Sequence, residues 1–442
     1  MNRRSFLRTT AAAGLAAGTF PQIARAAETK PAKLGGAAAH SGGFPSWPVF
    51  DATEEKALLD TLHSRQWFRG SGKAVGSFET AYAKLTGSKH CIATSCGTSA
   101  LSTALGALAL GPGDEVVMPP YTFIATYNVI VLDYALPVFA DIDLESFQID
   151  PQKMTAAITP QTRALLPVHI GGSPADLDSI LAVSRSKNIP VIEDACQAHL
   201  AEWRGRSVGT WGLAGCFSFQ ASKNLNSGEG GAVLTQDEAF AANCYNFHSP
   251  GRGHAVPKDS PHPALTRGSN FRLSEFQGSL LQAQMTRVVE QTRHRTENAD
   301  YLTRMLREIP GIRPAKLYPG VTRSAYHLYM FRYDAETFAG LERSKFLAAL
   351  SAEGIPCSSG YAPMQRDAYV RSLATDRHYL RVYGEARMKQ WLESLDCPQN
   401  AKLCREAVWF TQNMLLAPRA SMDHILEAIR KIQKHAPALA KA

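Results

Sequence analysis

A single lysine in this sequence stands between an apolar segment and a glycine cluster. The stretch "CFSFQASKNLNSGEGGAVLT", residues 216–235, begins strand-like, turns polar at Lys223 and ends in a cluster of glycines at 228–231. Ser218 lies five residues before the lysine on the same apolar run. A lysine amine in a site of low polarity has a lowered pKa and can form a Schiff base with a carbonyl. Lys223 is therefore either a reactive amine or a solvated loop charge.

A second stretch offers a helix start. The segment "TSCGTSALSTAL", residues 94–105, places Gly97 and Thr98 directly before an Ala/Leu-rich run. The first backbone N–H groups of a helix, together with nearby hydroxyl groups, can bind a phosphate. An ordinary N-cap by Thr98 or Ser99 would use the same residues, so both interpretations stay open.

Two more stretches suit a flat aromatic ligand. "PPYTFIAT" (119–126) presents Tyr121 and Phe123 after an apolar run, where an aromatic ring can either stack on a ligand or fill the core. "VIEDACQAH" (191–199) ends an apolar run in Glu193 and Asp194. A carboxylate that faces a pyridine nitrogen keeps that nitrogen protonated and makes the ring an electron sink. The alternative is an aspartate that caps the following turn.

Short apolar runs and helical patterns alternate between about residues 85 and 240. The apolar runs are 115–119, 137–142, 163–169, 190–196, 215–220 and 231–235, and the helical patterns include 97–110 and 175–188. Continuous apolar strands separated by helices predict an α/β fold with a mostly parallel sheet covered on both faces. Ligands of such sheets bind at the carboxyl ends of the strands, which is where the four stretches above fall.

The second part of the chain has a different pattern. A long helical segment, 274–309, is followed by shorter apolar runs at 327–333 and 354–359 and by a final helical pattern at 420–435. We expect a large domain over residues 46–295 and a smaller α+β domain over residues 296–442.

The first 26 residues resemble a twin-arginine signal peptide. They carry Arg3 and Arg4 before Ser5-Phe6-Leu7, a mildly apolar middle and an A-x-A pattern at 24–26, features of an exported precursor. Residues 27–45 are rich in Gly, Ala and Pro and predict an irregular linker. A periplasmic protein is expected, or a cytoplasmic one if the segment is only a basic terminus.

The charge and the cysteine content argue against several classes of protein. The formal net charge is +8; without the four arginines of the first 26 residues it falls to about +4, and no dense Lys/Arg run remains to indicate nucleic-acid or membrane binding. The eight cysteines show no zinc-ligand spacing. Small buried side chains are the expected role for most of them, although Cys397 and Cys404 could pair in an exported protein.

The order and spacing of these stretches resemble the DegT/DnrJ/StrS family of pyridoxal-phosphate-dependent sugar aminotransferases. The motifs are "GTSAL", "PYTFIAT", "VIEDACQAH", "SFQASKNLNSGEGGAV" and "GSNFRLSEFQGSL". The similarity runs from about Phe44 to the C-terminus. It implies the aspartate-aminotransferase-like fold (type I), with a seven-stranded sheet in the large domain and pyridoxal 5′-phosphate as cofactor.

By this resemblance, Lys223 forms the Schiff base (the internal aldimine) with the cofactor and shuttles a proton between the substrate carbon and the cofactor. Asp194 pairs with the pyridine nitrogen, Gln197 hydrogen-bonds the 3-hydroxyl group of the cofactor, and Phe123 stacks on its ring. His169, in "PVHIGG", corresponds to a histidine near the cofactor or has a structural role.

The remaining roles concern the phosphate. Gly97, Thr98 and Ser218 would hold it, and Asn270 would reach the phosphate of the neighbouring subunit's cofactor. The resemblance therefore implies a homodimer with shared active sites and no metal.

The implied activity is transfer of an amino group from glutamate or glutamine to a keto-sugar or keto-cyclitol. Residues 406–418, "EAVWFTQNMLLAP", resemble the branch that acts on keto-cyclitols, whereas Cys96 and Gln220 depart from the commoner residues of the family. One alternative is a sugar dehydratase of the same fold, in which a histidine replaces the lysine; Lys223 argues against it. Another is an exported, non-catalytic protein that kept the fold, which has no need of the Lys223, Asp194 and Gln197 set.

Overall fold

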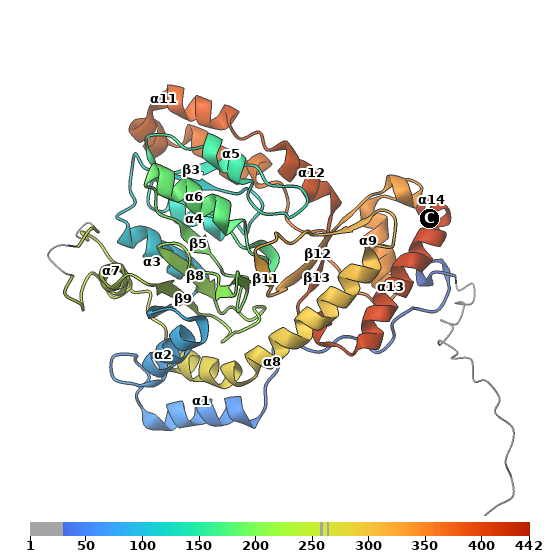
Figure 1. Ribbon diagram of the computed structural model, residues 1–442, viewed down its shortest axis with the longest axis horizontal. Coiled ribbons are helices and arrows are strands. Elements are labelled where there is room, and N and C mark those ends of the chain that lie inside the picture. Colours follow the sequence, from blue (N-terminus) through green and yellow to red (C-terminus); the bar gives the residue numbers. More distant parts are fainter. Residues whose placement is uncertain (1–29, 257–259, 263–264) are drawn as a thin grey trace, which may run out of the picture.

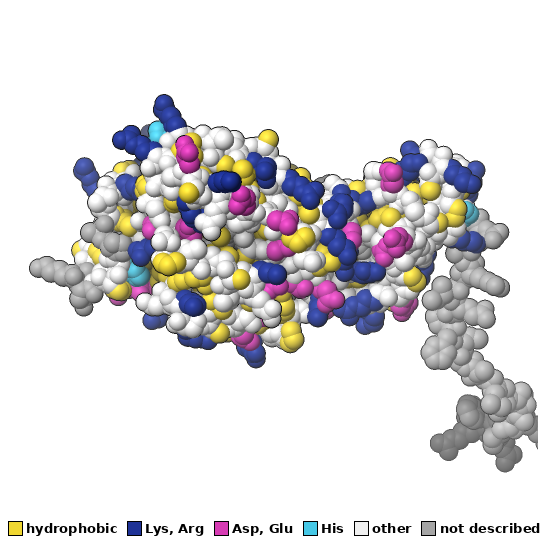
Figure 2. Space-filling view, turned by 90° about the horizontal axis from the view of Figure 1, so that it is seen from above, with side chains coloured by type: hydrophobic (Ala, Val, Ile, Leu, Met, Phe, Trp, Pro, Cys, Tyr) yellow, Lys and Arg dark blue, Asp and Glu magenta, His cyan; other side chains and the backbone are white. Residues whose placement is uncertain are grey.

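The computed structural model of the chain describes residues 30–256, 260–262 and 265–442. The proposed signal peptide, residues 1–26, lies outside the described residues. Two domains are connected by one long helix, α8 (Glu275–Leu306), which runs from beneath the large domain into the small one (Figure 1). Seen from above, the surface is hollowed between the two domains, and lysine and arginine side chains gather beside the hollow (Figure 2).

The large domain contains the predicted seven-stranded, mostly parallel sheet. Its strands, in spatial order, are β3 (Leu136–Phe139), β2 (Glu115–Met118), β4 (Thr162–Leu165), β5 (Ile192–Asp194), β8 (Ala214–Ser218), β9 (Gly231–Thr235) and β1 (His90–Thr94). Two parallel bridges, Leu165 to Val191 and Val168 to Asp194, join β4 to β5. Only β9 is antiparallel to its neighbours, β8 and β1.

Both faces of this sheet are buried because successive side chains of each strand point to opposite faces. Cys216 packs against one helical layer and Phe217 against the other. The first layer contains α3 (Gly97–Ala107), α4 (Ala125–Val131) and α7 (Glu238–His248). The second contains α2 (Ala74–Thr86), α5 (Pro151–Ala156), α6 (Leu177–Lys187) and the first half of α8. Such two-sided burial explains why the predicted strands are continuous apolar runs.

The small domain is built on an antiparallel sheet of β10 (Ile312–Pro314), β12 (Leu328–Tyr333) and β13 (Ala407–Thr411). Its core is closed by the end of α8, by α9 (Arg343–Ala352) and by α13 (Arg419–Lys434), whose Ile425, Ile429 and Ile432 are fully buried. The other elements are α1 (Ala52–Ser64), α10 (Ala368–Arg371), α11 (Arg377–Glu393), α12 (Pro398–Glu406), α14 (Ala436–Lys441), β6 (Glu202–Trp203), β7 (Arg206–Ser207) and β11 (Val321–Arg323).

Part of the C-terminal region returns to the large domain. Trp391 of α11 is fully buried in the same core cluster as β2 and β3, and its Nε1 donates to the carbonyl oxygen of Pro137 at 2.6 Å. The division into residues 46–295 and 296–442 stays a prediction; its boundary falls inside α8, and α11 lies over the large domain (Figure 1).

The segment expected to be a linker has defined contacts with the small domain. The buried carboxylate of Glu353 accepts hydrogen bonds from the backbone N–H groups of Ala32 and Ala39 at 2.7 and 2.8 Å, and from Lys431 Nζ at 2.8 Å. Composition alone indicated an irregular segment because these contacts are made by backbone groups, which leave no apolar pattern in the sequence.

Three absences hold for the part of the chain that the structure describes. No helix there is long and apolar enough to cross a membrane. No cluster of His, Cys, Asp and Glu side chains there could hold a metal ion. All eight cysteines are within the described residues and are free thiols, so Cys397 and Cys404 are not paired.

Candidate active site

A cleft of about 790 Å³ lies at the carboxyl ends of the large-domain strands, where the small domain meets the sheet. Seven of the eight predicted site residues line it: Gly97, Thr98, Phe123, Asp194, Gln197, Ser218 and Lys223. The eighth, Asn270, does not line this cleft and is exposed. The structure thus gathers side chains spread over more than a hundred residues of sequence into one site.

Lys223 is carried by the loop of the β8–β9 hairpin. Backbone bonds from Phe219 to Gly230 and from Ala221 to Gly228 close the loop at 2.7 and 2.9 Å. Gly228 has a φ of 82°, which favours glycine and explains part of the glycine cluster. Burial lowers the pKa of Lys223 from its ordinary value, and the negative charge of Asp194 opposes this effect. The amine therefore loses its proton more easily than a surface lysine, as a nucleophilic amine requires.

Asp194 is the last residue of β5, and its carboxylate is held in place from two directions. Thr126 Oγ1 donates to Oδ2 at 2.8 Å, and the backbone N–H of Cys196 donates to Oδ1 at 3.2 Å. The residue is 4% exposed. A buried carboxylate with fixed oxygens can face a positively charged ring nitrogen of a ligand in the cleft.

The N-terminus of α3 also lines the cleft. Cys96 is the N-cap: its Sγ accepts from the N–H of Ser99 at 3.3 Å, and Ser99 Oγ accepts from the N–H of Cys96 at 2.9 Å. Neither Thr98 nor Ser99 is the cap residue, so the Thr98 hydroxyl is available to a ligand. A Cβ added to Gly97 would lie 2.6 Å from Ser218 Cβ and 3.0 Å from Cys196 Sγ. Glycine is needed there to bring the helix start close to β8, and the result suits an anion.

The side walls of the cleft come from Phe123 and Gln197. Phe123 is 59% exposed although it is large and apolar, which is expected of a ring that covers a ligand rather than the core. Gln197 Oε1 accepts from the N–H of Gly171 at 2.7 Å, and its Nε2 donates to Tyr361 Oη at 3.1 Å. Both ends of this amide are fixed before a ligand binds.

Comparison with known proteins assigns the chain to a family. The sequence pattern of the DegT/DnrJ/EryC1/StrS aminotransferase family matches residues 49–407. The L-glutamine:2-deoxy-scyllo-inosose aminotransferase of Streptoalloteichus tenebrarius is 35% identical over 406 residues, which cover 89% of this chain and 95% of that protein. The chain belongs to the DegT/DnrJ/EryC1/StrS aminotransferase family. It is an aminotransferase, as the sequence motifs predicted.

Other members of the family are similar over nearly their whole length. The 3-amino-5-hydroxybenzoate synthase of Amycolatopsis mediterranei is 34% identical over 391 residues, 87% of this chain and 96% of that protein. A crystal structure of 3-amino-5-hydroxybenzoic acid synthase superposes with a TM-score of 0.77 at 31% identity and covers 92% of this chain and all of that one. The aminotransferase from Psychrobacter cryohalolentis has a TM-score of 0.76 at 30% identity, covering 87% of this chain and 98% of that one. The predicted type I fold is confirmed.

His169 is fully buried and does not line the cleft. Its Nδ1 accepts from the N–H of Ala175 at 3.0 Å, so Nε2 carries the proton and donates to Glu193 Oε2 at 3.0 Å. Of the two roles considered for this family histidine, the structure supports the structural one.

Several residues of the small domain also line the cleft, and the motif analysis did not assign them. They are His327, Leu328, Tyr361 and Trp409. The rings of Tyr361 and Trp409 meet edge to face with centroids 4.6 Å apart. The continuous apolar runs of β12 and β13 are typical of buried strands but do not reveal which large-domain loops these strands face.

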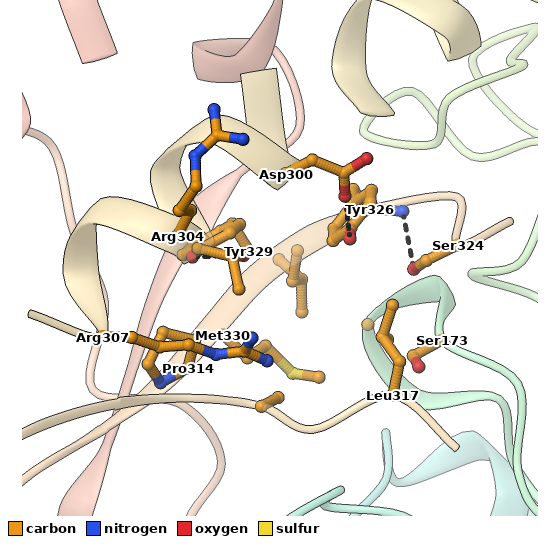
Figure 3. A pocket seen from close by; sticks show the side chains of 14 residues that line it. Ser173, Asp300, Arg304, Arg307, Pro314, Leu317, Ser324, Tyr326, Tyr329 and Met330 are labelled. Atoms are coloured by element: carbon orange, nitrogen blue, oxygen red, sulfur yellow. Dashed lines mark hydrogen bonds between the residues drawn. The ribbon is translucent and has the colours of Figure 1, made fainter. Parts of the chain in front are cut away.

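A second cavity, of about 250 Å³, is lined by residues of α8 and of the segment 324–330 (Figure 3). Ser324 and Tyr326 line it, and Tyr326 Oη donates to Asp300 at 3.3 Å, whereas the intervening His327 lines the active-site cleft. No lysine is among the described residues that line this second cavity. Amine chemistry is therefore assigned to the first cleft.

Proposed function

We propose that the protein is a pyridoxal-phosphate-dependent aminotransferase that moves an amino group from glutamine or glutamate to a keto-cyclitol or a related keto-sugar. The observation that carries this proposal is that Lys223, whose amine has a lowered pKa, lines one cleft together with the fixed carboxylate of Asp194 and the N-terminus of α3.

The residues of the cleft fit pyridoxal phosphate. The start of α3 at Gly97 and Thr98, with Ser218 beside it, offers N–H and hydroxyl donors to a phosphate, and Asp194 offers a carboxylate to a ring nitrogen. Phe123 can cover the ring. When bound, the cofactor supplies an electron sink for the substrate carbon.

The protein's own groups orient the reactants and move the proton. Lys223 is the base that can take a proton from the substrate carbon and return it, because its amine is neutral more readily than that of an exposed lysine. Thr126 holds Asp194 so that its charge stays directed at the ring nitrogen. Tyr361 and Trp409 cover the small-domain side of the cleft and limit the access of water.

The choice of acceptor is supported by the relatives. An L-glutamine:scyllo-inosose aminotransferase of Streptomyces griseus is 34% identical over 409 residues, 88% of this chain and 94% of that protein. The position of Lys223 disfavours the dehydratase alternative, which would have a histidine there, and the pre-positioned Asp194 and Gln197 disfavour a non-catalytic role.

The test is a pair of half-reactions followed by absorbance. Protein loaded with pyridoxamine phosphate is mixed with scyllo-inosose, 2-deoxy-scyllo-inosose and keto-sugars in turn, and we expect the aldehyde form of the cofactor to return with at least one keto-cyclitol. The variant Lys223→Ala should bind the cofactor without the visible absorption of the lysine-bound form. A wild-type protein that stays colourless with pyridoxal phosphate would refute the proposal.

We further propose a homodimer in which Asn270 serves the partner's site. Asn270 is exposed and sits next to the cleft, because Phe271 accepts a 2.7 Å hydrogen bond from the N–H of the cleft residue Ser95. Trp67 and Phe68, 50% and 55% exposed, are available to cover a partner.

Mixing two inactive variants tests the shared site. In a mixed dimer of Lys223→Ala and Asn270→Ala, one of the two sites has both residues intact if Asn270 acts across the interface. Activity should then return on mixing, after partial unfolding and refolding together. If Asn270 acted within its own subunit, every site would lack one of the two residues and the mixture would stay inactive.

Export by the twin-arginine route is also a proposal, supported by the sequence of residues 1–26. That route carries folded proteins, and a tightly bound cofactor stabilises only the folded state. Replacing Arg3 and Arg4 by lysine should leave the protein in the cytoplasm of the producing cell. Unchanged fractionation of this variant would refute export.

A further inference from the structure

His327 lies on a segment that is held tightly between the two domains. The segment 324–328 leads into β12, and the N–H of Ala325 donates to Gly172 at 2.9 Å. A Cβ added to Gly172 would lie 2.6 Å from the carbonyl oxygen of Gln197 and 3.1 Å from the backbone nitrogen of His327. The backbone of His327 is therefore fixed relative to Gln197, one of the residues that line the cleft.

The hydrogen bonds around Asn224 determine where the ring proton of His327 lies. Asn224 Nδ2 donates to the carbonyl oxygen of Ala325 at 2.7 Å, so Oδ1 is the acceptor that faces His327 Nδ1 at 3.3 Å. Nδ1 must then carry the proton. The other nitrogen, Nε2, keeps its lone pair. Among the described residues, it is not one of the fully buried side-chain polar atoms that lack a hydrogen-bond partner. Since His327 lines the cleft, Nε2 is an acceptor that a ligand in the cleft can reach.

Burial keeps this ring neutral. It lowers the pKa of His327 well below its ordinary value, and the positive charges of Lys223 and Arg295 act in the same direction. His199 is itself neutral, because burial lowers its pKa to about 3. A neutral His327 cannot hold an anion through charge, but it can accept a hydrogen bond from a hydroxyl group.

We propose that His327 Nε2 accepts a hydrogen bond from an acceptor-substrate hydroxyl on a carbon next to the ketone. This inference rests on the proposed function, because a keto-cyclitol has a hydroxyl group at that position. His327 and Lys223 line the same cleft, so a hydroxyl bound by His327 would lie on the ring whose carbonyl carbon receives the amino group. His327 is thus a residue that selects hydroxylated acceptors and orients their ring.

Two substitutions separate this role from a structural one. The amide of His327→Asn can still donate to Asn224 from the position of Nδ1, but it has no atom at the position of Nε2. The amide of His327→Gln reaches the position of Nε2. We expect His327→Asn to lower kcat/KM for scyllo-inosose about tenfold, the effect of one lost hydrogen bond in a desolvated site, and His327→Gln to restore most of it. His63→Gln, on the exposed surface of α1, is the control.

Four further readouts complete the test. The glutamine half-reaction and the thermal midpoint should be the same in His327→Asn and wild type, since neither uses Nε2. The dissociation constant of the unreactive probe scyllo-inositol, measured by calorimetry, should rise about tenfold in His327→Asn. An inosose that lacks both hydroxyls next to the ketone should react poorly with wild type and no worse with His327→Asn.

The outcomes distinguish this inference from the proposed function. If wild type converts scyllo-inosose but His327→Asn does so equally well, or if the glutamine half-reaction falls as far as the acceptor half-reaction, the role of His327 is refuted and the function stands. If wild type converts no inosose in the presence of bound cofactor, the acceptor class and the role of His327 both fall.

Discussion

Replacing Glu193 by glutamine should destabilise the large domain strongly although it changes only one oxygen to an amide nitrogen. Glu193 is fully buried on β5. Its Oε1 accepts from the N–H groups of Trp211 and Gly212 at 2.8 and 2.7 Å, and its Oε2 accepts from Gly209 N–H at 2.7 Å and from His169 Nε2 at 3.0 Å. Burial alone would raise the pKa of Glu193, but the hydrogen bond from His169 and the backbone donors hold it below its ordinary value.

The magnitude follows from counting donors. Whichever way the new amide is turned, its NH₂ group faces two buried N–H donors that lose their acceptor. Each buried donor left without a partner costs about 1–3 kcal/mol, so the free energy of unfolding should fall by about 2–6 kcal/mol. The control is Glu202→Gln, whose partner Arg323 lies near the surface; such a pair contributes below about 1 kcal/mol.

Urea unfolding of the apoprotein, followed by circular dichroism, measures the effect. The urea concentration at the midpoint should fall, while the slope of the free energy of unfolding against urea concentration stays the same. The apoprotein is required because a bound cofactor would stabilise both variants by mass action. Equal midpoints for Glu193→Gln and Glu202→Gln would show that the four hydrogen bonds do not stabilise β5 as reasoned here. Because Asp194 follows directly, Glu193→Gln should also weaken cofactor binding.

Three other perturbations test separate parts of the structure. Gly97→Ala should weaken pyridoxal phosphate binding at least about tenfold, since the new Cβ would collide with Ser218; an unchanged dissociation constant in a fluorescence titration would contradict the close approach. The lowered pKa of Lys223 means that the unfolded chain binds its proton more readily than the folded one. The stability of apoprotein should therefore rise relative to Lys223→Met as the pH increases from neutral towards 10.5, and urea midpoints that differ by a constant amount would contradict it. Glu353→Ala should release residues 30–40 from the small domain, so limited proteolysis should cut there first; equal resistance of wild type and variant would count against this anchoring role.

The large-domain part of the site could be predicted because its residues occur at local boundaries. Asp194 ends a buried strand, Gly97 begins a helix, and Lys223 stands between a strand and a turn. Each boundary is marked by a change of composition within a few neighbouring residues. In a mostly parallel sheet such boundaries meet at one edge, so their proximity in space followed from the strand pattern.

The small-domain part could not be predicted in this way. Tyr361 contacts Gln197 across 164 residues of sequence, and no local pattern indicates that partner. The N-cap of α3 was also missed, because cysteine is not a usual cap residue. The packing of α11 on the large domain was not predicted for a similar reason. Trp391 indicates that one face of the helix is buried, but it does not indicate in which domain's core.

Helix α8 also determines how far apart the two walls of the active site stand. Its 32 residues correspond to about 48 Å at the rise of an α-helix, and the sequence contains no proline there. One end packs under the large-domain sheet, and the other lies in the small-domain core, which contains side chains of β12 and β13 (Figure 1). The helix therefore acts as a spacer of set length. A substitution that bent or shortened α8 should therefore change the separation of the two walls, although no residue of α8 lines the cleft.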